Sequence, residues 1–193
     1  MSEHPPPLLG EPLPVELANT HFAWHGQVHD GLGRPGDLAA WLQAVAGRLP
    51  FDPAVADLEH VTAADLREAR GLRDALRVLL AAAAAGQPLD GDAARVLGET
   101  AARSPHWTEL KLRPEPIAVL RSDARPVRMA LAAIAEEAAA LVGGAGAEDV
   151  RACPAPDCML FFRKDHPRRS WCSPRCADRA RSARYYARRR AGR

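Results

Sequence analysis

The four cysteines of the chain all lie in its last quarter and form two close pairs. The pairs are Cys153-x4-Cys158 and Cys172-x3-Cys176, with thirteen residues between them. Each pair can present two sulfur atoms from one turn of backbone, and two such pairs can surround one tetrahedral Zn²⁺ ion. Four thiolates leave no open position for water, so this pattern predicts a structural zinc ion. The alternatives are iron bound at the same four sulfurs and four unrelated free cysteines.

The residues around the second pair predict a helix that begins at the metal. Ser173 is a favoured N-cap residue, and Pro174 suits the first helical position. The helix then runs from Ser173 to Arg190. Leu160, Phe161, Phe162 and Trp171 are expected to form a short hairpin beside the metal. About 40 residues rarely fold without a metal or disulfides, so zinc is expected to hold this module together.

The predicted helix is rich in arginine and carries two adjacent tyrosines. Arginine pairs with phosphate or with guanine in the major groove, and tyrosine donates to phosphate or stacks on a base. Two arginines of the preceding hairpin are expected to join this surface. The candidate nucleic-acid contacts are Arg168, Arg169, Arg175, Arg179, Arg181, Arg184, Tyr185, Tyr186, Arg188, Arg189 and Arg190.

The net charge of +2 conceals a strong asymmetry along the chain. Residues 1–150 hold 13 Lys/Arg against 21 Asp/Glu, whereas residues 151–193 hold 13 against 3. Such a basic tail points to a polyanionic partner. Duplex DNA fits best because a rigid knot beneath a basic helix suits a groove. RNA, an acidic protein, the acidic front of the same chain and a solvated tail without a partner remain open.

The front of the chain predicts a helical domain. Apolar residues at helical spacing, with capping and stop signals, predict five helices and two strands. The helices are expected at 15–29, 37–49, 62–85, 91–103 and 126–142, and the strands at 107–113 and 117–121. Asn19-Thr20 would lie inside the first of these helices or end it. Asp37 and the Thr62–Asp65 capping box are expected to start the second and third helices. Trp24, Trp41 and Trp107 are expected in the core.

Three residues near the start are candidates for binding a small ligand: Asn19, Thr20 and Trp24. A buried capping amide is the alternative for Asn19. His21, His25 and His29 would share one face of a helix and form a candidate second metal site. Scattered surface histidines are the alternative. Phosphate loops, serine elbows and metalloprotease histidine pairs do not occur in the sequence, so no catalytic residue is proposed and an enzyme is not expected.

The predicted fold class is mainly α with a small β-hairpin. Residues 1–14 are expected to form a flexible lead-in, 15–146 a helical domain, and 147–193 a treble-clef or zinc-ribbon-like module that ends in the basic helix. The start of the chain lacks the pattern of a signal peptide, and no apolar run reaches the ~20 residues of a membrane span. A cytoplasmic protein without a membrane partner is therefore expected, where thiols stay reduced.

The cysteine module resembles the CGNR zinc finger. The segment Trp171-Cys-Ser-Pro-Arg-Cys-Ala-Asp-Arg179 is similar to its Trp-Cys…Cys-Gly-Asn-Arg motif. The four cysteines match its metal positions, and Arg179 matches its arginine. Ala177 and Asp178 replace its glycine and asparagine; this leaves the metal site untouched, while Asp178 would repel phosphate.

The front of the chain resembles the ABATE domain that precedes this finger. Val15-Glu-Leu-Ala-Asn-Thr20 and Asp37-Leu-Ala-Ala-Trp-Leu42 are similar to its Asn-Thr and Leu-x-x-Trp-Leu patterns. The resemblance implies a stress-induced transcription regulator that binds zinc and DNA. The front domain would sense a small-molecule effector or form a homodimer. The alternative is an adaptor for RNA or protein, with a structural zinc finger and a ligand-binding front domain.

Overall fold

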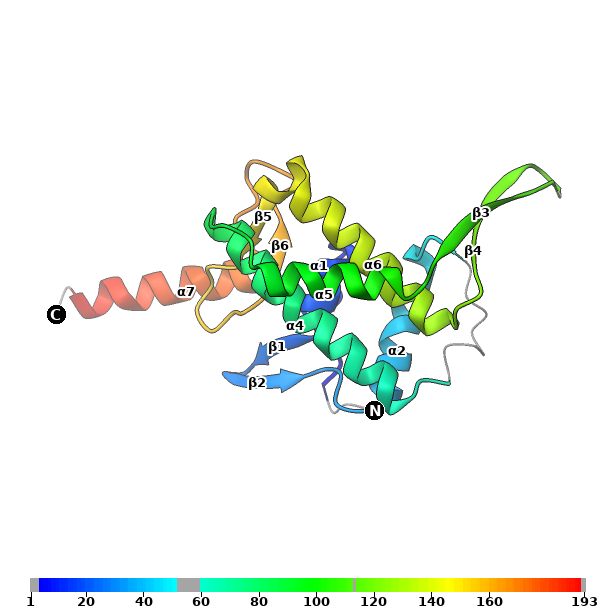
Figure 1. Ribbon diagram of the computed structural model, residues 1–193. Coiled ribbons are helices and arrows are strands. Elements are labelled where there is room, and N and C mark those ends of the chain that lie inside the picture. Colours follow the sequence, from blue (N-terminus) through cyan, green and yellow to red (C-terminus); the bar gives the residue numbers. More distant parts are fainter. Residues whose placement is uncertain (1–3, 52–59, 113, 192–193) are drawn as a thin grey trace.

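The computed structural model describes residues 4–51, 60–112 and 114–191 and is mainly helical (Figure 1). The α-helices are α1 (Leu13–Ala18), α2 (Pro35–Val45), α4 (Ala63–Ala85), α5 (Gly91–Ala102), α6 (Pro126–Gly143) and α7 (Pro174–Ala191). Two 3₁₀ helices are η1 (Ala46–Arg48) and η2 (Ala145–Asp149). Three antiparallel pairs join β1 (His21–Trp24) to β2 (Gln27–Asp30), β3 (His106–Lys111) to β4 (Ile117–Ser122), and β5 (Val150–Ala152) to β6 (Phe161–Arg163). The predicted fold class is confirmed.

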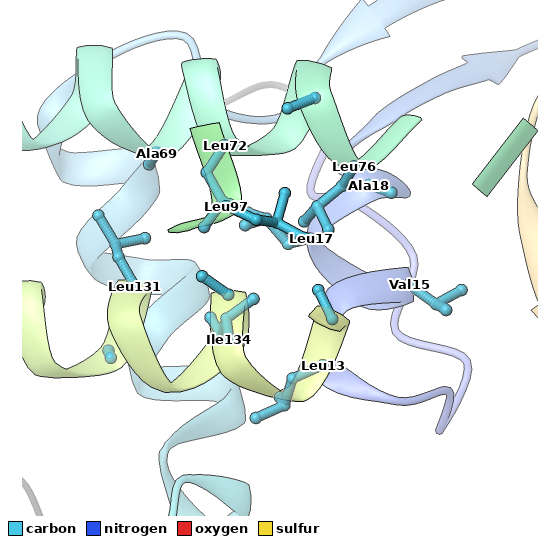
Figure 2. Packing of buried hydrophobic residues seen from close by; sticks show 14 of the residues in the cluster. Leu13, Val15, Leu17, Ala18, Ala69, Leu72, Leu76, Leu97, Leu131 and Ile134 are labelled. Atoms are coloured by element: carbon cyan, nitrogen blue, oxygen red, sulfur yellow. The ribbon is translucent and has the colours of Figure 1, made fainter. Parts of the chain in front are cut away.

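The core lies where α1 packs against α4 and α6. All six residues of α1 are buried, so this short helix is covered on every side. Figure 2 shows the cluster, to which α4, α5 and α6 contribute mainly leucines and alanines. Its labelled members are Leu13, Val15, Leu17, Ala18, Ala69, Leu72, Leu76, Leu97, Leu131 and Ile134. Helix α4 also contacts β5, so one helix links this core to the cysteine module.

The capping box expected at the start of α4 is confirmed. Thr62 Oγ1 accepts a hydrogen bond from Asp65 N at 3.2 Å, and the Asp65 carboxylate accepts one from Thr62 N at 2.8 Å. Gly86 ends the helix in a left-handed conformation with φ 63°, which costs glycine little. Local capping signals therefore set both ends of the central helix.

The first helix ends at Ala18, as in the alternative where Asn19-Thr20 ends it, and its expected extension to His29 is wrong. Asn19 is the C-cap of α1, and the chain then forms the β1–β2 hairpin. His25 (φ 48°) and Gly26 (φ 77°) form its two-residue turn, in which both positions need positive φ. His21 pairs with Asp30 and Phe22 with His29. Neighbouring residues of a strand point to opposite faces, so His21 and His29 cannot share a metal ion as proposed.

The start of the chain is more tightly held than a flexible lead-in. Residues 1–3 lie outside the described residues, but Glu11, Leu13 and Pro14 are buried. The Glu16 carboxylate accepts hydrogen bonds from Leu9 N at 3.0 Å and from Glu11 N at 2.9 Å. A buried acidic side chain therefore fixes the backbone before α1.

Helix α2 starts two residues earlier than predicted. Arg34 is its N-cap and Asp37 lies in its first turn, where the Asp37 carboxylate accepts a hydrogen bond from Arg34 N at 3.1 Å. Asp37 thus stabilises the start of the helix without occupying the cap.

The β3–β4 hairpin projects from the body at the end opposite to α7 (Figure 1). Trp107 lies on this hairpin and is 51% exposed, so its expected place in the core is wrong. Trp41 is buried as expected, and Trp24 is half-buried. The predicted strand end at Arg113 lies outside the described residues.

No helix of the described segments combines the length and the apolar character that crossing a membrane requires.

Candidate metal centre

The four cysteine sulfurs converge on one point. The Sγ atoms of Cys172 and Cys176 lie 3.5 Å apart, and that of Cys158 lies 3.9 Å and 3.7 Å from them. With Cys153, all four sulfurs fall within 4.8 Å of one another. A tetrahedron with Zn–S bonds of about 2.3 Å has sulfur–sulfur edges of about 3.8 Å, so the spacing fits zinc.

Two local structures deliver the sulfurs. Cys153 and Cys158 lie in the loop between β5 and β6, where Cys153 N donates to Leu160 O at 2.9 Å and Cys158 N to Ala155 O at 3.1 Å. Cys172 directly precedes the capping residue of α7, and Cys176 lies in its first turn. Ser173 Oγ accepts a hydrogen bond from Cys176 N at 3.4 Å. The basic helix therefore begins at the cysteine cluster, as expected, because its capping residue lies between two of the cysteines.

The hairpin of the module differs from the expected one. Strand β6 contains Phe161 and Phe162 but pairs with β5, which precedes the first cysteine. Phe162 packs with the cysteines, whereas Phe161 packs in the main core with Val150. Side chains alternate along a strand, so successive phenylalanines face the two clusters. The sequence showed the phenylalanines but not the partner strand.

The electrostatics of the cluster favour a cation. Hydrogen bonds from the thiols of Cys158 and Cys172 lower the pKa of Cys153. Donating these bonds raises the pKa values of Cys158 and Cys172. A bound divalent ion resolves this competition because it holds each sulfur as a thiolate. Arg179 adds positive charge, with Nη2 3.3 Å from Cys176 Sγ.

These features define a class of protein: an α-helical domain that carries a four-cysteine zinc module and ends in a basic helix. Residues 11–145 match the ABATE family, described as "Putative stress-induced transcription regulator", and the chain belongs to this family. Residues 150–189 match the CGNR zinc finger, and the four cysteines form its one structural zinc site. Neither family is one of enzymes. None of the curated proteins matches the chain.

Asn19 joins the helical core to the zinc module. Its side-chain amide donates to Phe161 O at 2.9 Å and accepts from Phe161 N at 2.9 Å. Thr20 Oγ1 donates to Leu17 O at 2.7 Å. Both side chains are fully buried, so of the three candidate ligand contacts only Trp24 retains accessible surface.

Glu11 makes a second connection that sequence reasoning missed. One carboxylate oxygen accepts a hydrogen bond from Arg163 N at 2.8 Å, and the other pairs with Arg169. Arg169 also stacks on Phe162, with its guanidinium carbon 5.2 Å from the ring centroid. The pKa of Glu11 is raised because burial outweighs these favourable contacts. Arg169 was expected to contact nucleic acid, but these contacts give it a role in stabilising the fold. Nothing in the sequence around Glu11 indicated that this glutamate would bind Arg169.

The remaining arginines lie either in the first turns of α7, near the cysteines, or on its exposed C-terminal part. Arg175 lies over Trp24, with 4.6 Å between guanidinium carbon and ring centroid, and Arg184 lies over Trp171 at 5.7 Å. Arg181 pairs with Asp178. Every residue from Arg181 to Arg190 is exposed, including both tyrosines, and Arg168 is exposed on the preceding loop.

Proposed function

We propose that the zinc module binds duplex DNA through α7 and that the protein regulates transcription by this contact. The observation that carries the proposal is the exposure of the whole segment from Arg181 to Arg190 on a helix whose base is fixed at the cysteine cluster. This segment holds five arginines and no acidic residue. A positive helix on a rigid base is suited to a polyanion.

The dimensions of α7 support a groove-binding role. Its 18 residues span about 27 Å at 1.5 Å per residue. The major groove of B-DNA is about 12 Å wide and admits one α-helix. Figure 1 shows α7 extending away from the body, so DNA can approach the exposed part from several sides.

The position of each arginine along the module narrows the set proposed to face DNA, because the arginines at the base of α7 lie against the folded body and those from Arg181 onward lie on the exposed segment. Arg169 is held by Glu11, Arg179 lies against Cys176, and Arg175 lies against Trp24. The proposed DNA contacts are Arg168, Arg181, Arg184, Tyr185, Tyr186, Arg188, Arg189 and Arg190. Phosphate contacts would give most of the affinity, and a short helix reads few bases. Specific binding would therefore need a second contact or a homodimer formed through the helical domain.

The test is fluorescence anisotropy of the full zinc-loaded chain with a labelled duplex, over about 50 to 200 mM salt. Affinity is expected to fall steeply as the salt concentration rises. The slope of the logarithm of the binding constant against the logarithm of the salt concentration should decrease in magnitude by about one for each phosphate-contacting arginine removed. Replacing Arg188, Arg189 and Arg190 by glutamine should lower the slope by about three. Affinity that does not change with salt would reject the proposal.

A charge-matched control separates a local contact from net charge. Arg95 and Arg103 are exposed arginines of the helical domain and Arg121 is a half-buried arginine of β4, and each is paired with a carboxylate. Replacing these three by glutamine removes the same charge and should leave the slope nearly unchanged. If both triple variants lose the same affinity, binding is not localised to α7.

The same titration with single-stranded RNA tests the adaptor alternative. Duplex DNA is expected to bind more tightly, because the proposal places α7 in a groove. A clear preference for RNA would support the adaptor and contradict DNA binding.

A further inference from the structure

A cavity of about 900 Å³ lies between the N-terminal segment, the β1–β2 hairpin and the zinc module. Its walls are mainly apolar and include Leu9, Phe22, Trp24 and Leu160. The size is within the range of sites for small organic molecules, which are typically apolar with a few polar groups. The cavity borders the zinc site, because Cys158 and Cys176 contribute to its lining, whereas Cys153 and Cys172 do not.

The cavity contains one arginine that is poised for a carboxylate. The Arg175 guanidinium lies over the Trp24 ring, with its carbon 4.6 Å from the ring centroid. The N–H groups lie in the guanidinium plane and remain available for a bidentate pair with a carboxylate. Within the described residues Arg175 has no ion pair, whereas Arg169 and Arg181 each pair with a carboxylate.

The other charges around the cavity limit the charge of a ligand. Arg179 already faces the sulfur of Cys176, and Asp157 adds a negative charge to the lining. Four thiolates around one Zn²⁺ carry a net charge of −2. A single free guanidinium in these surroundings can match one negative charge, and a dianion such as phosphate would be repelled.

The backbone of the lining is unusual. His25 (φ 48°) and Asp157 (φ 56°) are the two non-glycine residues of the described chain with positive φ, and both line this cavity. His25 forms the turn of the front hairpin, and Asp157 lies in the loop between the first two cysteines. Such strained positions gather at ligand sites, where the surrounding structure holds them.

We propose that this cavity binds a small organic monocarboxylate. The apolar body of the ligand packs against Trp24 and Phe22, and the carboxylate of the ligand pairs with Arg175. The site lies between the segments that match the two families and includes the first turn of the basic helix. The proposal does not depend on whether α7 binds DNA.

The test is isothermal titration of the full zinc-loaded chain with 1-naphthoate, indole-3-acetate and octanoate. At least one is expected to bind in equimolar ratio with a Kd of about 100 μM or lower. Naphthalene-1-carboxamide, a neutral analogue of the first probe, and the dianion 1-naphthyl phosphate should bind at least about tenfold more weakly than 1-naphthoate.

The variant Arg175→Gln should lower carboxylate affinity about tenfold without changing that of the carboxamide. Arg184→Gln is the matched control, because Arg184 lies over Trp171 on the same helix but does not line the cavity. Zinc content and the unfolding temperature show that each variant is folded. The proposal is overturned if no carboxylate binds below about 1 mM, if both variants bind alike, or if the phosphate binds most tightly.

Discussion

The side chain of Asn19 forms two hydrogen bonds with the backbone of Phe161, 142 positions later in the chain. The amide meets both polar groups of one residue and thereby extends the edge of β6. Asn19 is also the C-cap of α1, where its backbone N–H donates to Val15 O and Leu17 O, so this one residue connects the end of α1 to the zinc module. The zinc module is therefore docked on the helical core.

Asn19→Ala should destabilise the protein by about 2–4 kcal/mol, because it leaves a buried N–H and a buried C=O of Phe161 without partners. Denaturant unfolding measures this loss. Zinc should also be released at lower chelator concentration. Thr100→Ala is the control, since Thr100 Oγ1 donates only to Val96 O within α5. If Asn19→Ala weakens stability no more than Thr100→Ala does, the connection has little energetic value.

Cys158→Ser should abolish stoichiometric zinc binding, because a tetrahedral structural site needs all four ligands. The loss should extend beyond the module, since Val150 and Phe161 of its strands pack in the main core. We expect weaker amide protection in α4 as well, measured by hydrogen exchange.

Ser173→Ala is the comparison for this variant. It removes the cap of α7 beside the metal, at a cost of about 1 kcal/mol, but no ligand. It should retain one zinc ion per chain. Full zinc occupancy in Cys158→Ser would contradict the four-sulfur site.

Glu11→Ala should cost about 3 kcal/mol, because it leaves Arg169 and the N–H of Arg163 without their buried partner. A double-mutant cycle with Arg169→Ala measures the coupling between the two side chains. We expect about 1 kcal/mol or more of interaction energy. Additive losses would show that the pair does not act as a unit.

Asp65 makes the stability of the protein depend on pH. Burial by itself would raise the pKa of this carboxyl, but hydrogen bonds from Arg125 and Thr62 outweigh it and lower the pKa below 3.8. A lowered folded-state pKa gives stability that is present above the ordinary pKa and is lost as pH falls through the folded value. Asp65→Ala should thus cost about 2 kcal/mol at neutral pH, and the difference from the parent should shrink below about pH 3.8.

Thermal unfolding of both chains across this range provides the measurement. Asp90→Ala serves as a reference, since Asp90 caps α5 from an exposed position without an ion pair among the described residues. At neutral pH, Asp90→Ala should lower the stability of the protein less than Asp65→Ala does. A constant difference between Asp65→Ala and the parent at every pH would refute the linkage.

Local signals predicted the long helices well. The capping box at Thr62, the glycine at the end of α4 and the proline at the start of α6 act within one helical turn, so sequence alone identifies them. The prediction of a helix at 15–29 was wrong because the apolar residues of this segment fit both the helical and the strand period. Asn19 ends the helix, and the His25–Gly26 turn forms a hairpin instead. Trp107 was misplaced because large apolar residues usually predict burial, and this one lies on a projecting hairpin.

The sequence by itself determined the zinc ligands and the basic helix. Four sulfurs at fixed spacing, and a cap directly after the third, are short-range properties that need no knowledge of the rest of the chain. Only the tertiary structure decided what each arginine contacts. Glu11 holds Arg169, Trp24 lies against Arg175, and the cavity lies between segments more than a hundred residues apart. Such contacts depend on how the helical core and the zinc module dock, and no local pattern encodes that arrangement.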